Sequence, residues 1–218
     1  MTADEVLARL QAAANPVNVA GMAHYGISTA GTLGVPMPAL RALSRECGKD
    51  HALALELWAS GIHEARILAS LVEDGGAVTA HQVNLWIRDV DSWDVCDQLC
   101  QNLLRYTPAA FDLAARWSRA RHEFTRRAAF SLMAGLAVKS KEPDERFLAF
   151  LPLIRNAATD DRNLVKKAVN WALRQIGKRS PALRREAMAT ASAIRELGTP
   201  GARWIAADAL RELRARPR

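Results

Sequence analysis

The sequence predicts an all-α protein built as an α-solenoid, a stack of helix pairs, in one domain over residues 1–218. Aromatic residues make up only 6% of the chain, and alternating runs of β-branched residues are scarce, which argues against strands. Alanine, leucine and arginine dominate, and all three favour helices. Apolar residues also recur at helical spacing between short breaks that contain glycine, proline or serine.

The expected helices follow one another along the whole chain. One apolar face contains Leu53, Leu57 and Trp58, and another contains Phe130 and Met133. The helix starts at residues 63–69, 122–129 and 161–169 resemble each other, and their basic residues Arg127 and Lys167 are spaced by 40 residues, as in two-helix repeats. Arg66 and Arg127 are spaced by 61 residues, so the repeat is degenerate. A compact helical bundle is the alternative.

The composition excludes several classes of protein. Hydrophobic residues make up 50% and charged residues 24%, which is typical of a globular chain and not of a disordered one. No apolar stretch is long enough for a membrane span, and the N-terminus lacks the pattern of a secretory signal. Cys47, Cys96 and Cys100 lack metal-finger spacing and indicate free thiols in a reducing compartment. We therefore expect a cytoplasmic protein with no membrane association.

The net charge of +7 is unevenly distributed. Residues 1–109 carry 7 basic and 12 acidic side chains, a net charge of −5, whereas residues 110–218 carry 23 basic and 11 acidic side chains, a net charge of +12. A half with this charge is a candidate phosphate-binding surface. A genome that favours arginine is the alternative explanation, and charge alone does not separate the two.

The segment from Asp91 to Cys100 contains the first candidate site. Ser92 is a predicted N-cap, and Asp94 in the first turn would complement the helix dipole. Trp93 and Asp97 are four residues apart and share a helix face, where an indole plane and a carboxylate suit a flat cationic ligand. The alternative is that Trp93 belongs to the core and Asp97 to a surface salt bridge.

Two basic segments in the second half are candidate phosphate contacts. A helix at residues 166–179 carries one tryptophan among its cations. The second segment clusters arginines around a helix start at residues 119–127. For the helix at residues 166–179, the alternative is a buried tryptophan with a charged face that is only solvated. For residues 119–127, the alternative is a charged loop without phosphate contacts. The residues in question are Lys166, Lys167, Trp171, Arg174 and Lys178 of the first segment and Arg126 and Arg127 of the second.

Motifs of other enzyme classes are missing from the sequence. It contains no HExxH or paired CxxC pattern, so a metal site is not expected. It also lacks the phosphate-binding loop of nucleotide hydrolases and the G-x-S-x-G motif of serine esterases.

The order of five motifs resembles the AlkD-type DNA alkylation repair glycosylases, which are built from HEAT-like helical repeats. The resemblance covers about residues 22–179. It implies a superhelix of these repeats whose concave basic face binds DNA. The motifs are Tyr25 followed by Leu33-Gly34-Val35-Pro36, Ile62-His63-Glu64-Ala65-Arg66, Asp91-Ser92-Trp93-Asp94-Val95-Cys96-Asp97, Arg126-Arg127-Ala128-Ala129, and Lys167 through Arg174.

The resemblance implies hydrolysis of the N-glycosidic bond of cationic N3- or N7-alkylated purines in duplex DNA, without base flipping. It implies that Asp97 is the catalytic carboxylate, that Trp93 and Trp171 are cleft tryptophans, that Arg127 is an active-site arginine, and that Tyr25 lies near the lesion. No metal or organic cofactor is implied, and we expect a monomer. Two other hypotheses stay open: a non-catalytic repeat protein that binds damaged or branched DNA, and a helical scaffold for a protein partner.

Overall fold

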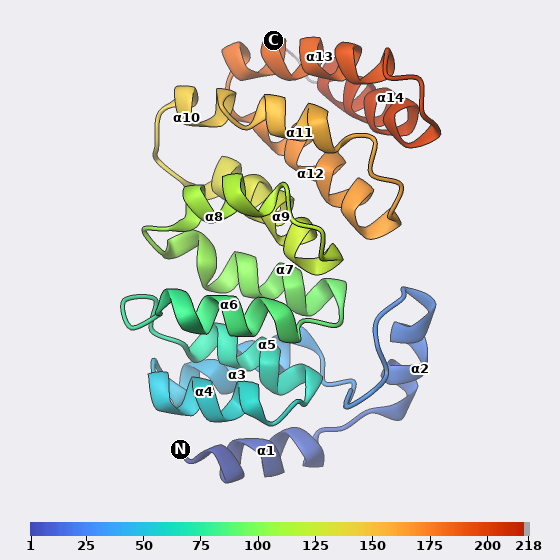
Figure 1. Cartoon of the computed structure of the whole chain (residues 1–218). Helices are drawn as coiled ribbons and strands as arrows, with labels where there is room; N and C mark the ends of the chain where they lie inside the picture. The colour runs from blue at the N-terminus through green and yellow to red at the C-terminus, as the bar shows by residue number, and fades with distance from the viewer. Residues whose placement is uncertain (216–218) are drawn as a thin grey trace. The chain divides into compact units, whose positions relative to one another are not determined.

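The computed structural model describes residues 1–215, and every regular element in this range is a helix (Figure 1). The prediction of an all-α protein is therefore confirmed. The chain folds into two compact units, Met1–Thr107 and Pro108–Arg218. The boundary between the units lies two residues before the boundary between the acidic half (residues 1–109) and the basic half (residues 110–218) of the sequence. None of the described helices is both long enough and apolar enough to span a bilayer.

The first unit consists of α-helices of nine to eleven residues, and a single 3-10 turn follows the last of them. Its helices are α1 (Ala3–Ala12), α2 (Pro16–His24), α3 (Met37–Cys47), α4 (His51–Ala59), α5 (His63–Val72), α6 (Ala80–Asp89) and α7 (Trp93–Asn102), and the 3-10 turn covers Leu104–Tyr106. Helix α5 packs against α3, α4 and α7 and forms the centre of the unit. The indole rings of Trp58 and Trp86 stack with centroids 4.3 Å apart and join α4 to α6.

Helix α5 is buried on nearly all sides, including at its polar start. Ile67 and Leu68 are buried as their spacing predicts, but so are His63 and Glu64 in the first turn. The Glu64 carboxylate accepts backbone N–H bonds from Leu33 at 2.8 Å and from Gly34 at 2.6 Å. A longer bond of 3.3 Å comes from the backbone N–H of Val35. A buried charge needs such partners, and here they fix the loop between α2 and α3 on the start of α5.

The loop held by Glu64 requires glycine at position 34. Gly34 has a φ of +78°, in the left-handed region that glycine adopts without strain. A Cβ atom at this position would lie only 2.3 Å from the carbonyl oxygen of Asn15. Gly34 therefore lets the loop pass close to the backbone at the start of α2.

The second unit contains three long helices, α9, α12 and α14, and a fourth, α13, of similar length. Its helices are α8 (Ala110–Trp117), α9 (Glu123–Lys139), α10 (Asp144–Leu148), α11 (Leu151–Ala157), α12 (Asn163–Arg179), α13 (Pro181–Arg195) and α14 (Pro200–Ala215). Helix α9 packs extensively against α12, and both helices bury small residues such as Ala128 and Ala168. Figure 1 shows the two helices within the second unit. Gly177 of α12 allows α13 and α14 to pack closely, because a Cβ there would lie 2.8 Å from the Leu213 side chain of α14 and 3.0 Å from Ala187 of α13.

We predict that Glu64→Gln destabilises the protein by about 2–4 kcal/mol, because the amide offers one acceptor where the carboxylate offers two and turns a donor toward a backbone N–H. Urea unfolding followed by circular dichroism measures the change. Glu56→Gln on exposed α4 surface is the matched control. Equal stability of the two variants would show that the carboxylate does not anchor the loop.

Candidate functional site

The start of α7 positions the first group of candidate residues. Trp93 is the first residue of α7, and Asp97 follows one turn later, so both side chains lie on the same helical face. Both are half-buried, whereas Val95 and Leu99 on another face are fully buried in the core. The helix therefore directs its apolar residues inward and leaves an indole and a carboxylate accessible next to each other.

Trp93 is also fixed to the end of α2. Its indole N–H donates a hydrogen bond of 2.9 Å to the backbone carbonyl of Tyr25, the C-cap residue of α2. The Tyr25 side chain is 76% exposed. The structure thus brings together Tyr25 and Trp93, which are 68 residues apart in sequence. Neither packs into the core, so the alternative that Trp93 is a core residue is not supported.

A hydrogen-bonded pair stands behind this face. The His63 imidazole Nε2 lies 2.8 Å from a carboxylate oxygen of Asp94, and the Ser92 hydroxyl donates to the other oxygen at 2.6 Å. Ser92 is the N-cap residue of α7 as predicted, but its hydroxyl accepts no capping bond, and the backbone N–H of Val95 binds the Asp94 carboxylate instead. The backbone N–H of His63 donates to the Gly31 carbonyl at 2.9 Å. The start of α7 is thereby connected to α5 and to the loop that Glu64 holds.

The charges of this pair support each other. Burial disfavours the charged form of His63, but the hydrogen bond and negative charge of Asp94 outweigh it, and nearby Glu64 and Asp91 add to them, so the pKa of His63 is raised. Burial likewise opposes ionisation of Asp94, yet His63, Ser92 and the Val95 backbone N–H hold the pKa of Asp94 below its usual range. Each group therefore favours the charged form of the other.

The sequence singled out neither His63 nor Glu64 as a site residue, and it predicted for Asp94 only an interaction with the helix dipole. The available signal was the position of a histidine and a glutamate at the start of a helix whose other residues are almost all apolar. Such residues need buried partners. Their partners lie about thirty positions away in sequence, and spacing along one helix does not reveal them.

The second group of candidate residues belongs to the second unit. Arg127 is buried, with 6% of its surface exposed, and its Nη1 donates to the Leu164 carbonyl at 2.7 Å. Arg126 forms an ion pair of 3.1 Å with Asp160. Asp160 is also bound by Arg162, whose Nη2 lies 2.6 Å away. Burial opposes ionisation of Asp160, but these guanidinium groups keep the pKa of this carboxyl low. The starts of α9 and α12 are therefore held together by arginines.

Helix α12 carries the remaining candidates along one face, with Lys167 and Trp171 in its first half and Arg174 and Lys178 in its second. Trp171 is half-buried and Lys167 is exposed, and the two share a face at a spacing of four residues. Arg174 and Lys178 instead turn toward α14, where both bind Glu212, and the Arg174 Nη1 is 2.5 Å from the carboxylate. The basic helix thus offers Lys167 and Trp171 to solvent, while α14 partly neutralises its second half.

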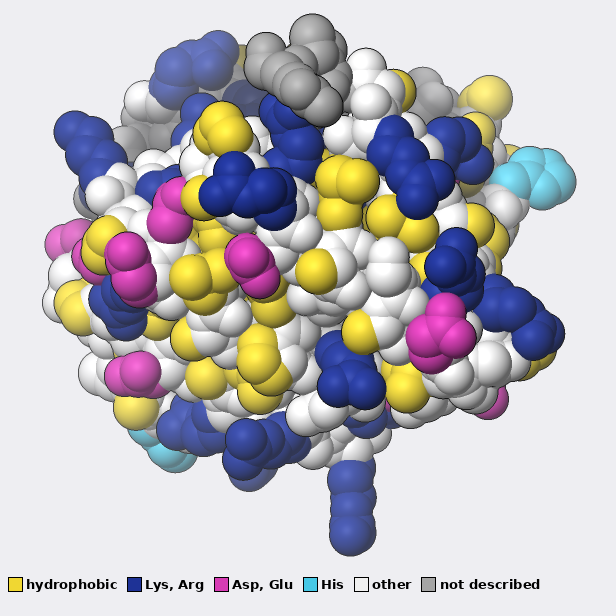
Figure 2. Space-filling view, turned by 90° about the horizontal axis from the view of Figure 1, so that it is seen from above, with side chains coloured by type: hydrophobic (Ala, Val, Ile, Leu, Met, Phe, Trp, Pro, Cys, Tyr) yellow, Lys and Arg dark blue, Asp and Glu magenta, His cyan; other side chains and the backbone are white. Residues whose placement is uncertain are grey.

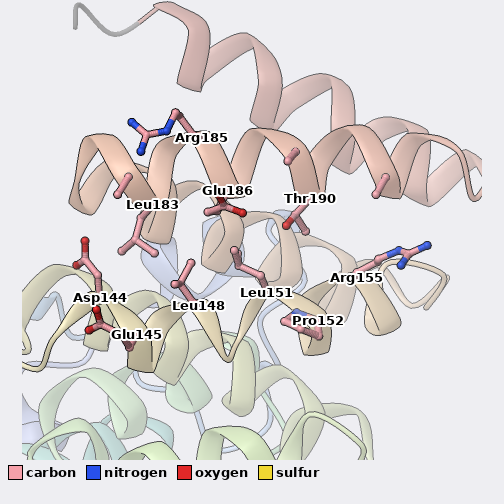
Figure 3. Close-up of a pocket in the computed structure, with 13 residues that line it drawn as sticks. Asp144, Glu145, Leu148, Leu151, Pro152, Arg155, Leu183, Arg185, Glu186 and Thr190 are labelled. Carbon is pink, nitrogen blue, oxygen red and sulfur yellow. The ribbon is translucent and has the colours of Figure 1, made fainter.

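A groove of about 770 Å³ lies between α10, α11 and α13 of the second unit (Figure 3). Leu148, Leu151 and Pro152 give it apolar walls, Glu186 projects from the middle of α13, and Arg155 lies toward one end. None of the candidate residues lines this groove. Among residues 1–215, no group of three or more His, Cys, Asp or Glu side chains is placed to hold a metal ion.

The His63–Asp94 pair predicts a pH-dependent stability. With the pKa of His63 raised above 6.5, its contribution is fully present below that pH and is lost as the pH rises through the folded-state value. With the pKa of Asp94 lowered below 3.8, its contribution is present above that pH and is lost on further acidification. The free energy of unfolding of the wild type should therefore exceed that of His63→Gln by more at about pH 6 than at about pH 9.

Urea unfolding at a series of pH values measures this difference. His81→Gln, at an exposed position of α6, provides the control for the loss of a histidine elsewhere in the same unit. A wild-type advantage over His63→Gln that does not change between the two pH values would contradict the ion pair.

Comparison with solved structures identifies a similar fold. A structure described as "a new family of proteins related to the HEAT-like repeat DNA glycosylases with affinity for branched DNA structures" matches with a TM-score of 0.78 and 20% sequence identity. The match covers 88% of this chain and 83% of the other. At this identity the likeness shows the fold alone, and it confirms the predicted architecture of HEAT-like repeats. The concave basic face stays a prediction.

No curated protein matches the sequence. A family model described as DNA alkylation repair enzyme, however, matches residues 6–213. The match includes the loop at residues 33–36, the buried start of α5, the Trp93–Asp97 face of α7 and the basic α12. Because nearly the whole chain is matched, the protein belongs to the DNA alkylation repair enzyme family.

Proposed function

We propose that the protein is a DNA glycosylase that removes cationic N3- or N7-alkylated purines from duplex DNA, with Asp97 as its catalytic carboxylate. The observation that carries the proposal is the shared face of Trp93 and Asp97 on α7, held in place by the bond from Trp93 to the Tyr25 carbonyl. Membership of the family supports a role in DNA alkylation repair. The combination of an indole plane and a carboxylate suits a substrate with positive charge.

The reaction needs little acid catalysis, because the alkylated purine is already positively charged. The bond between C1′ of the deoxyribose and the purine nitrogen breaks, and its electron pair neutralises the departing base. Positive charge then develops on the sugar, and a carboxylate at Asp97 stabilises it electrostatically. A water oxygen bonds to C1′, and its proton passes to Asp97 or to solvent. The products are a neutral alkylated base and an abasic site.

The other candidates have binding roles in this proposal. The Trp93 indole packs against the sugar-phosphate backbone and excludes bulk water from the developing charge. In the second unit, Lys167 and Trp171 supply a cation and an aromatic plane on one face of α12. Arg126 and Arg127 lie at the start of α9 and are assigned to phosphate positioning through the resemblance. Arg127 fixes the start of α12 through the Leu164 carbonyl, so its loss would also disturb that helix.

A second candidate function is non-catalytic binding of branched DNA. It is favoured by the similar solved structure, which belongs to a family with affinity for such DNA. Both functions use a basic surface and predict salt-dependent binding. They differ in base release, which requires the carboxylate.

We predict that the wild type releases 7-methylguanine or 3-methyladenine from methylated duplex DNA and that Asp97→Asn lowers the single-turnover rate by about 100-fold or more, because the amide cannot offset positive charge on the sugar. Chromatography with mass detection of free bases measures the rate. Asp112→Asn, an exposed position on α8, is the control and should keep the wild-type rate. Equal rates for Asp97→Asn and the wild type would exclude Asp97 as the catalytic group.

A DNA competition experiment distinguishes the glycosylase function from the branched-DNA function. For a glycosylase we expect an unlabelled four-way junction to compete for the protein no better than a linear duplex of equal length, as measured by fluorescence anisotropy at fixed salt concentration. Strong preference for the junction, together with no base release by the wild type, would favour the branched-DNA function and reject the glycosylase.

A further inference from the structure

Trp204 of α14 is an exposed tryptophan that the proposed reaction does not use. Its side chain is 42% exposed, although tryptophan is normally among the more buried residue types. The Nζ atom of Lys166 on α12 lies 5.4 Å from the centroid of its ring, within cation–π distance. A large indole held in solvent beside a cation is a candidate binding element.

The contact belongs to a regular ladder between two helices. Helices α12 and α14 pack against each other, and residues of α12 four positions apart meet residues of α14 that are also four positions apart. This regularity means that the two helices run in the same direction (Figure 1). The successive pairs are Lys166 with Trp204, Asn170 with Asp208, and Arg174 with Glu212.

The first pair differs from the others in charge. Asp208 and Glu212 supply carboxylates to the second and third pairs, and Glu212 also binds Lys178. Burial opposes ionisation of Glu212, but Lys178 and Arg174 hold the pKa of this carboxyl below its usual range. At the first pair, an indole occupies the place that a carboxylate takes further along. Lys166 therefore keeps a positive charge that no carboxylate among residues 1–215 neutralises by an ion pair.

Further cations flank this end of the ladder. Lys167 follows Lys166 and is exposed, and Arg203 precedes Trp204 and is also exposed, with its Nη1 bound to the Gly198 carbonyl. Asp161 is also exposed, and its Oδ1 and the Lys166 Cδ both lie within 4 Å of the position that a Cβ on Gly201 would take. Lys166 is the cation that the structure places at the indole, and Lys167 and Arg203 are its exposed neighbours along the two helices. Seen from above, Lys and Arg side chains gather mainly around the rim of the visible face (Figure 2).

We propose that Trp204 and Lys166 form a further DNA-binding site, in which the indole packs against a deoxyribose and Lys166 binds the adjoining phosphate. The ligand is the sugar-phosphate backbone of duplex DNA, because cations beside an aromatic plane match its alternating phosphates and sugars. This inference rests on the proposed DNA-binding function and adds α14 to the interface. It also assigns the phosphate contact to Lys166 at the start of α12, where α14 leaves the charge available, in preference to Arg174 and Lys178.

Titration of a fluorescent unmodified duplex at several NaCl concentrations tests the site. We expect Trp204→Ala to weaken binding about fivefold to tenfold with little change in salt dependence, because the indole contact is not ionic. Trp204→Phe should recover part of the affinity. Lys166→Ala should reduce the slope of log affinity against log salt by about one, as for the loss of one phosphate contact.

Matched controls come from the same unit. Val138→Ala removes another exposed apolar side chain, and Lys139→Ala removes another exposed lysine at the end of α9; both should bind like the wild type. Circular dichroism verifies that each variant is folded. Binding of Trp204→Ala within twofold of the wild type, or an unchanged salt slope for Lys166→Ala, would overturn the site while leaving the glycosylase proposal intact. If the wild type itself failed to bind duplex DNA, both proposals would fall.

Discussion

The Glu64 carboxylate accepts three backbone N–H groups of the loop between α2 and α3, and the geometry of the first unit depends on this interaction. The adjacent residue, His63, binds the Asp94 carboxylate at the start of α7. Two neighbouring side chains of α5 therefore hold both the loop that follows Tyr25 and the helix that carries Trp93. Because each is buried, the loss of either partner would leave a polar group without compensation.

This arrangement explains how a short helix can present an indole and a carboxylate in a fixed orientation. Helix α7 buries Val95 and Leu99, which fixes its rotation about its own axis. The His63–Asp94 pair fixes its start, and the bond from the Trp93 indole to the Tyr25 carbonyl fixes the aromatic plane. Asp97 is then held on the same face by helical geometry alone. Electrostatic catalysis benefits from such preorganisation, because no reorientation is needed as charge develops.

The second unit uses charge in a different way. Its net charge of +12 does not give uniformly available cations. Arg126 and Arg162 both bind Asp160, and Arg174 and Lys178 both bind Glu212, so part of the basic character holds helices together. The exposed Lys167 and the Lys166–Trp204 pair are the cations that we propose to bind the DNA backbone. Helical packing thus selects which cations of a basic sequence can act in binding.

The helical class, the divide in charge and the shared face of Trp93 and Asp97 could be predicted before the structure was known, because they follow from composition and from the period of a single helix. The sequence also supplied the order of motifs that indicated the family. Tertiary structure decided the partners of His63, Glu64 and Asp94 and the attachment of Trp93 to Tyr25, since these contacts join residues about 30 to 70 positions apart. It also showed that Arg174 and Lys178 form ion pairs with Glu212, whereas Lys166 contacts the ring of Trp204. The sequence pattern of α12 does not distinguish these three cations. Spacing along one helix gives the direction of a side chain, but only the neighbouring helix determines whether its charge is neutralised there.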